Sequence, residues 1–171
     1  EAALGLSVLA VMLWWVATDR IRPNGLALSV DENTLYVSDT GVTHVKDTPA
    51  AIHAYCVNTA GDALTYKSEF ARCDAGLLDG FRVDWRGNLW ASSADAVRCY
   101  APDGTLIGRI PIPETVGNLC FGGPKRNRLY IAAQTSLATL ERRSATQPGL
   151  GMALSSLAVL VNAARLRSTD K

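Results

Sequence analysis

The pattern of apolar and polar residues changes twice along the chain. Residues 2–17 form an uncharged apolar run. From about 18 to 143, short alternating runs are separated by Asp, Asn, Gly and Pro, which is typical of strands and turns. Within 150–167, apolar residues recur at helical spacing and basic residues follow them. We therefore predict an apolar segment at 1–17, a β region at 18–143 and a tail at 144–171 that contains a short helix.

The β region contains a repeat. Three segments each combine a strand, a polar turn and a second strand that opens with Leu and an aromatic residue: NGLALSVDENTLYVSDT from Asn24, DGFRVDWRGNLWASSAD from Asp79 and GNLCFGGPKRNRLYIAAQT from Gly117. Two more strands follow each of the first two segments, and the segments begin 55 and 38 residues apart. Four-stranded units at such spacings are typical of propeller blades. We predict an all-β fold, a β-propeller portion of about three blades, the last without an evident fourth strand.

The repeat also predicts what lies between the blades. The aromatic residues at the second position of each second strand are Tyr36, Trp90 and Tyr130. We interpret them as packing between adjacent blades rather than as substrate contacts. A closed propeller needs roughly four to eight blades. The outer faces of three blades would stay open, which leaves room for self-association.

Composition narrows the classes of partner. The net charge is +1, from 17 basic and 16 acidic residues, so no basic surface for nucleic acid is expected. The 16-residue run at 2–17 is shorter than the roughly 18 to 20 residues of a membrane span, and we do not expect membrane insertion. It suits the core of an export signal or a misassigned start equally well, so cytoplasmic and exported locations both stay open. The four cysteines form no C-x-x-C pair, and we expect buried free thiols, with a disulfide as the alternative.

Candidate chemistry lies just before the first strand of each unit, where the corners of blades converge on a central channel. These positions hold Asn24, Asp79 and Gly117. Amide and carboxylate oxygens suit Ca²⁺ or Mg²⁺, whereas glycine offers no side-chain donor. Asn-Gly and Asp-Gly are also favoured turn dipeptides, so tight turns are the alternative. The shared register favours a site, and the Asp-Gly at Asp103 is assigned to a plain hairpin.

The strings RPNGLALSVDENTLYVSDTG, DGFRVDWRGNLWASSADAVRCYAPDGTLIGRIPIPE and GNLCFGG with LYIAAQTSL resemble the gluconolactonase, senescence marker protein and luciferin-regenerating enzyme family, over about 16–143. The resemblance implies a six-bladed propeller with one divalent cation, held by a glutamate, two asparagines and an aspartate. Two of these ligands fall on Asn24 and Asp79. We expect Ca²⁺, with Mg²⁺, Mn²⁺ or Zn²⁺ as alternatives. The implied activity is hydrolysis of a sugar lactone such as gluconolactone, with Asp79 both a ligand and the catalytic acceptor of a proton from water.

The match also has departures. The family's glutamate and first asparagine should precede Asn24, where the acidic residues are Glu1 and Asp19, neither in a strand-corner motif. We therefore expect a truncated form whose activity is open. Two alternatives remain. One is a non-catalytic binding propeller, and the other is a membrane-anchored protein resembling strictosidine-synthase-like propellers, which share a P-N-G motif but not the segment at Gly117.

Overall fold

The computed structural model describes residues 20–61, 63–124 and 126–141. The apolar segment predicted at 1–17 and the helix predicted within 144–171 lie outside these residues. The described part of the chain contains eleven β-strands and one 3-10 turn, η1 (Gly41–Thr43). The all-β class predicted from the repeat is confirmed.

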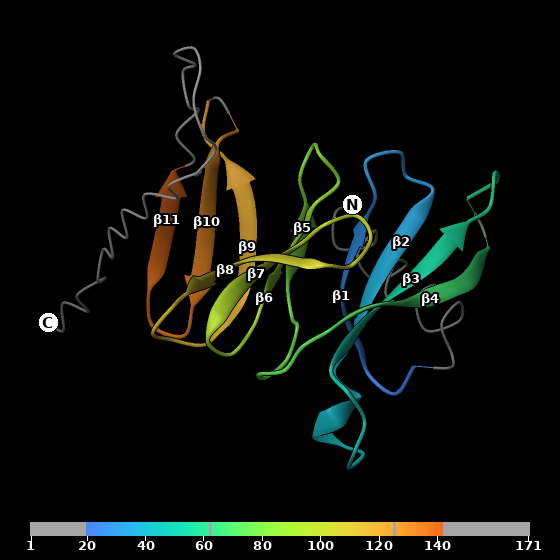
Figure 1. Ribbon diagram of the computed structural model, residues 1–171. Helices are drawn as coiled ribbons and strands as arrows, with labels where there is room; N and C mark the ends of the chain where they lie inside the picture. Colours follow the sequence, from blue (N-terminus) through green and yellow to red (C-terminus); the bar gives the residue numbers. More distant parts are fainter. Residues whose placement is uncertain (1–19, 62, 125, 142–171) are drawn as a thin grey trace, which may run out of the picture.

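The strands form three antiparallel sheets that follow the repeat (Figure 1). The first has the order β1-β2-β3-β4, with bounds Pro23–Leu28, Thr34–Asp39, Ala51–Val57 and Leu64–Arg72. The second has the order β5-β6-β7-β8, with bounds Phe81–Val83, Leu89–Ser92, Ala96–Tyr100 and Leu106–Pro111. The third, three-stranded among the described residues, has the order β11-β10-β9, with bounds Leu137–Glu141, Arg128–Ala133 and Val116–Gly122. Each sheet is one predicted blade.

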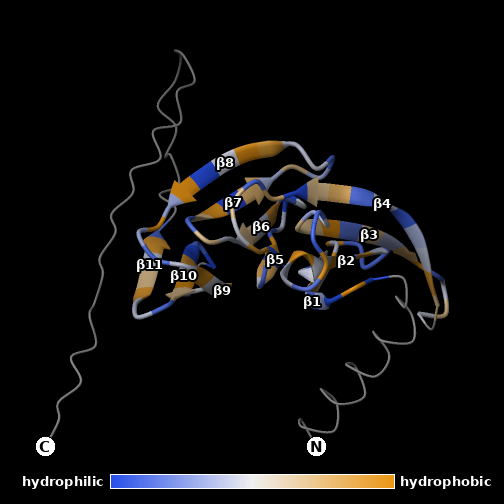
Figure 2. Cartoon of the chain, turned by 90° about the horizontal axis from the view of Figure 1, so that it is seen from below, coloured by the Kyte–Doolittle hydropathy of each residue, from blue (hydrophilic) through white to orange (hydrophobic). Residues whose placement is uncertain are grey.

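The first strand of each blade lies on the inner side of the assembly. β5 contacts both β1 and β9, which belong to the neighbouring blades. Figure 2 shows β1, β5 and β9 next to one another, with β4 and β8 on the opposite, outer side. The corners where these inner strands begin are therefore brought together at one end of the molecule, as the repeat predicts, although Asn24 and Gly117 lie within β1 and β9 and Asp79 precedes β5.

Apolar side chains fill the spaces between the blades. The first two blades share a core that includes Tyr36, Ile52, Phe81 and Leu89. The second and third blades share another that includes Val97, Ile110, Val116, Leu119, Leu129 and Ile131. Because burial of apolar area is the main favourable contribution to folding, these two layers hold the blades in register.

The predicted aromatic positions occupy these layers. Tyr36 belongs to the core shared with Phe81 and Leu89 of the second blade, and its ring lies 4.7 Å from that of Phe70 in its own blade. The indole of Trp90 meets Phe121 of the third blade edge to face, with 6.1 Å between ring centroids. Tyr130 occupies the same position of the third blade, on the face for which the described residues provide no further sheet. Packing between blades is confirmed for Tyr36 and Trp90.

Aspartates organise the turns at the other end of the inner strands. The carboxylate of Asp84 accepts hydrogen bonds from the backbone of Arg86 and Asn88, both at 2.9 Å, and from the Trp90 indole at 3.1 Å. Gly87 provides the left-handed conformation of this turn, with φ of 83°. In the first blade, Asp31 organises the turn by accepting hydrogen bonds from the Ser29 hydroxyl and from the backbone and side chain of Asn33.

Candidate functional site

The two predicted ligand residues meet at the corner between the first two blades. Asn24 lies in β1, and Asp79 lies two residues before β5. The Asn24 side-chain amide donates a hydrogen bond to Oδ1 of Asp79 at 2.7 Å, although the residues are 55 positions apart in the chain. Among the described residues, no other group donates a hydrogen bond to the Asp79 carboxylate. The structure therefore places an amide and a carboxylate side by side at the inner end of adjacent blades.

The glycines that follow these residues serve close packing rather than turns. A Cβ on Gly25 would lie 1.9 Å from the Asp79 carbonyl oxygen, and a Cβ on Gly80 would lie 2.3 Å from Oδ1 of Asn118. Neither glycine has a left-handed backbone conformation, and neither lies in a turn. Gly104, which follows Asp103 in a true hairpin, has φ of 87°. The turn alternative is thus wrong at both corners and right at the hairpin.

Two buried serines fix the backbone of the corner. The backbone N–H of Gly25 donates to Oγ of Ser38 at 2.7 Å, and that of Gly80 donates to Oγ of Ser92 at 3.0 Å. Both serine side chains are fully buried. They hold the start of β1 and the start of β5 in the same way, which is why Asn24 and Asp79 have equivalent positions. The third blade has Ala132 at the corresponding place.

The third corner differs from the other two. Gly117 offers no side chain, as predicted, but its carbonyl accepts the Gly80 N–H at 3.1 Å and thereby ties the second and third blades. The next residue, Asn118, lies against Gly80 and lines the same cavity of about 370 Å³ as Asn24 and Asp79. Sequence reasoning missed Asn118 because it stands one position later than Asn24. Asn24 and Gly117 both lie at a β-bulge, in β1 and β9 respectively, so Asn118 stands in register with Gly25.

The side-chain oxygens at this corner are of the type that a hard divalent cation prefers, but there are too few of them to complete its coordination. Carboxylate and amide oxygens are the donors that Ca²⁺ prefers, and it takes roughly six to eight of them. Among the described residues, the Asn24 side chain makes one hydrogen bond, the one to Asp79. Rotation of its amide by half a turn would therefore present the oxygen in place of the nitrogen without the loss of any other contact. Asn24 and Asp79 can therefore supply two ligands, and the remaining ones must come from water or from elsewhere.

Residues 20–61, 63–124 and 126–141 contain no second candidate metal site. This part of the chain holds no group of three or more His, Cys, Asp or Glu residues placed to bind a metal. It also holds no helix long and apolar enough to cross a membrane. All four cysteines are free thiols, but Cys56 and Cys120 are exposed, so the prediction of buried thiols is wrong for these two.

Known proteins resemble this part of the chain. The family model described as SMP-30/Gluconolactonase/LRE-like region matches residues 14–135. A gluconolactonase of Zymomonas mobilis is 34% identical over 127 residues, which is 72% of this chain and 35% of that protein. A gluconolactonase structure from Xanthomonas campestris is 42% identical with a TM-score of 0.57, and the match covers 65% of this chain and 34% of that one.

A third similar protein is described as calcium-binding. The calcium-binding protein regucalcin of Agrobacterium tumefaciens is 27% identical with a TM-score of 0.57, over 68% of this chain and 39% of its own. The chain thus spans little more than a third of the length of the relatives it matches. The family model covers well over half of its residues, and the chain belongs to the SMP-30/gluconolactonase/LRE-like family.

Proposed function

We propose that the chain carries part of the cation site of a sugar-lactone hydrolase, with Asn24 and Asp79 as ligands and Ca²⁺ as the expected cation. The observation that carries this proposal is the meeting of Asn24 and Asp79 at 2.7 Å, in a polar cavity lined by residues of all three blades. Family membership supports the reaction class, because two of the relatives are gluconolactonases. The calcium-binding relative supports the choice of cation.

Each residue has a distinct role in this proposal. A bound cation would act as a Lewis acid on the lactone carbonyl. Asp79 accepts the proton of the attacking water through the carboxylate oxygen that Asn24 does not bond. The water oxygen then bonds to the carbonyl carbon, the ring C–O bond breaks, and the ring oxygen leaves as a hydroxyl by taking the proton that Asp79 accepted. Asn24 contributes its amide oxygen as a ligand after the amide turns away from the hydrogen bond that it donates to Asp79.

Calcium titration of the purified chain by isothermal calorimetry tests the cation site. We expect the chain to bind Ca²⁺ and Asp79→Ala to lose that binding. Asp103→Ala is the matched control, because Asp103 also precedes a glycine but lies in an exposed hairpin. Light scattering on the same samples shows whether binding accompanies self-association through the open blade faces. Absence of Ca²⁺ binding by the unaltered chain would contradict the proposal.

Lactone hydrolysis tests the proposed base separately. In a protein of the family that is active on gluconolactone, the equivalent of Asp79→Asn should abolish turnover while the cation still binds, since an amide cannot accept the proton. Normal turnover in that variant would remove Asp79 as the base.

A non-catalytic binding function is the second candidate. The missing donor at Gly117 favours it, and Ca²⁺ binding by a family protein that shows no lactone turnover would support it.

A further inference from the structure

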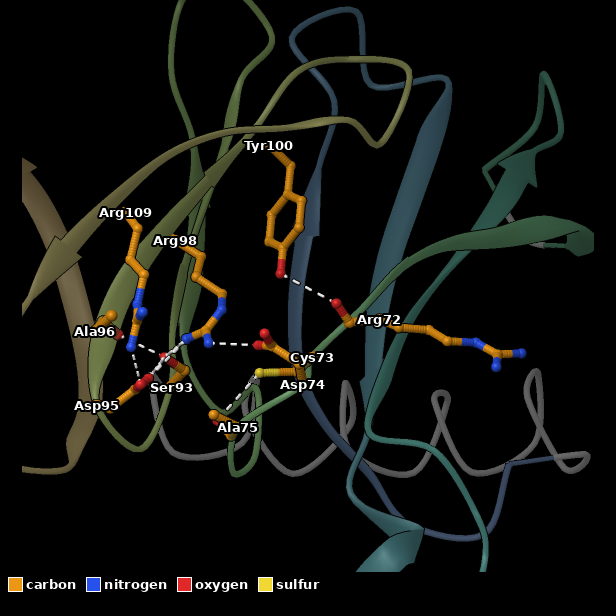
Figure 3. Close-up of polar contacts among 10 residues, drawn as sticks. All are labelled: Arg72, Cys73, Asp74, Ala75, Ser93, Asp95, Ala96, Arg98, Tyr100 and Arg109. Carbon is orange, nitrogen blue, oxygen red and sulfur yellow. Dashed lines mark hydrogen bonds and ion pairs between the residues drawn. The ribbon is translucent and has the colours of Figure 1, made fainter.

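A buried arginine lies near the segment that leads to Asp79. Arg98 belongs to β7 and is 2% exposed. Its guanidinium donates to Oδ1 of Asp74 at 2.6 Å, to Oδ1 of Asp95 at 2.9 Å, and to the hydroxyl of Ser93 (Figure 3). A charge this well removed from water requires such partners, and several are present.

The three acceptors come from two different parts of the chain. Ser93 and Asp95 lie in the connection between β6 and β7, within five residues of Arg98. Asp74 lies instead in the crossover 73–80, which joins the first blade to the second and carries Asp79 near its end. The hydrogen bond from Arg98 to Asp74 is therefore a tie between the core of the second blade and the crossover.

The electrostatics of the cluster agree with this geometry. The hydrogen bond and the positive charge of Arg98 lower the pKa of Asp74. Arg98 likewise lowers the pKa of Asp95, a carboxylate that also pairs with Arg109. Burial by itself would lower the pKa of Arg98, but its bonds to Asp95 and Asp74 outweigh burial and raise it. All three groups are charged at neutral pH.

Other contacts limit the freedom of the crossover between Asp74 and Asp79. Gly76 has φ of 79°, and a Cβ there would lie 2.3 Å from the Cβ of Ala94. The crossover is thus pressed against the same connection that holds Ser93 and Asp95. Leu78, the residue before Asp79, is 1% exposed in the core between the first two blades. An anchor at Asp74 and a buried Leu78 leave Asp79 little room to move.

We propose that Arg98 is a positioning residue, which fixes the crossover through Asp74 so that Asp79 meets Asn24 at the corner. The role in cation binding rests on the proposed function, whereas the effect on the crossover does not. Asp74 is the useful residue to change. Its side chain is 86% exposed, and without it Arg98 keeps the acceptors Ser93 and Asp95, so the fold should persist.

Hydrogen exchange measured by mass spectrometry tests the effect on the crossover. In Asp74→Asn we expect peptides covering 74–80 to exchange about tenfold faster, with β7 unchanged, because the charged tie is lost. Asp74→Glu keeps a carboxylate and should restore most of the protection. The matched control is Glu69→Gln, which removes the exposed ion pair of Glu69 with Arg72 at the end of β4. It should leave the crossover unchanged.

Calcium titration of the same variants tests the consequence at the corner. We expect Asp74→Asn to weaken Ca²⁺ binding about fivefold and Glu69→Gln to leave it unchanged. Unaltered exchange of 74–80 in Asp74→Asn would overturn the positioning role, as would equal acceleration in the Glu69→Gln control. If no form of the chain binds Ca²⁺, the proposed function fails, and the exchange result still decides the role of Arg98.

Discussion

The first two blades and the third blade share a scaffold but differ at the same corner. In the first two, a ligand-type side chain is followed by a glycine whose N–H is held by a buried serine. In the third, Gly117 takes the place of the ligand, Asn118 that of the glycine, and Ala132 that of the serine. The apolar positions show no such break, since Leu35, Leu89 and Leu129 occupy equivalent positions at or next to the start of β2, β6 and β10.

This difference separates what folding requires from what a site requires. Each layer between blades needs apolar residues of suitable size, so those positions recur in all three units. A corner needs particular oxygen donors and a backbone that can approach its neighbour closely. Where the donor is lost, the glycine and serine that support it are lost as well. We interpret the first two corners as the specialised ones and the third as scaffold.

The largest effect on stability should come from a substitution that fills the narrow space between the first two blades at the first corner. Gly25→Ala places a Cβ 1.9 Å from the Asp79 carbonyl oxygen, so the two blades must separate. We expect a loss of about 3 kcal/mol in the free energy of unfolding. Gly117→Ala is the control, because a Cβ there would meet nothing within 4 Å. Urea denaturation measures both, and equal stabilities would remove the proposed distinction between the corners.

A smaller loss should follow from Asp84→Asn, since the third blade turns without a carboxylate and has Gly122 at the equivalent position. Burial by itself would raise the pKa of Asp84, but hydrogen bonds from Asn88, Trp90 and the backbone of Arg86 and Asn88 together hold it below its ordinary value. We expect a loss of about 2 kcal/mol in the free energy of unfolding at pH 7.

The pH dependence of this loss has a definite sign. Because the pKa of Asp84 is lowered in the folded protein, its stabilisation is complete above the unfolded value of about 3.9 and disappears as pH falls through the folded value. The difference between Asp84→Asn and the unaltered chain should therefore shrink from pH 6 towards pH 2.5. A difference that stays constant over this range would show that shape, and not charge, makes Asp84 stabilising.

Removal of a supporting serine should cost less. In Ser92→Ala the Gly80 N–H keeps the Gly117 carbonyl as acceptor at 3.1 Å, so the loss should be about 1 kcal/mol. Ser38→Ala should cost about as much, because it removes the hydroxyl that accepts the Gly25 N–H at 2.7 Å. Thermal unfolding of both variants measures the difference. A larger loss for Ser92→Ala would show that the two corners are not supported alike.

Regular features of the fold could be predicted from the sequence. The three blades, their strand order and the packing of Tyr36 and Trp90 follow from the repeat, because period-two alternation and turn residues are local signals. The pairing of Asn24 with Asp79 also followed, since equivalent positions of a repeat converge in space.

The remaining features depend on contacts between blades, which a repeat alignment does not contain. The glycines at 25 and 80 resembled turn residues because close approach across a blade interface is not a local property. Asn118 was missed because it stands at the position of Gly25 and not at that of Asn24, and the tie between Arg98 and Asp74 joins residues 24 positions apart without a shared motif. Ser38 and Ser92 stood in the same column of the repeat, a signal that could have identified them.

The smallest effect tests whether the third corner faces the same centre as the others. Gly117 lines the cavity with Asn24 and Asp79 and has free space around its Cα, so Gly117→Asp adds a carboxylate without a clash. If the three corners converge, Ca²⁺ affinity at low salt should rise about threefold, because a third oxygen donor or its charge then acts on the same cation. Gly117→Ala is the control for the added bulk. Unchanged affinity in Gly117→Asp would mean that the third corner takes no part in the site, and that any cation here belongs to the first two blades.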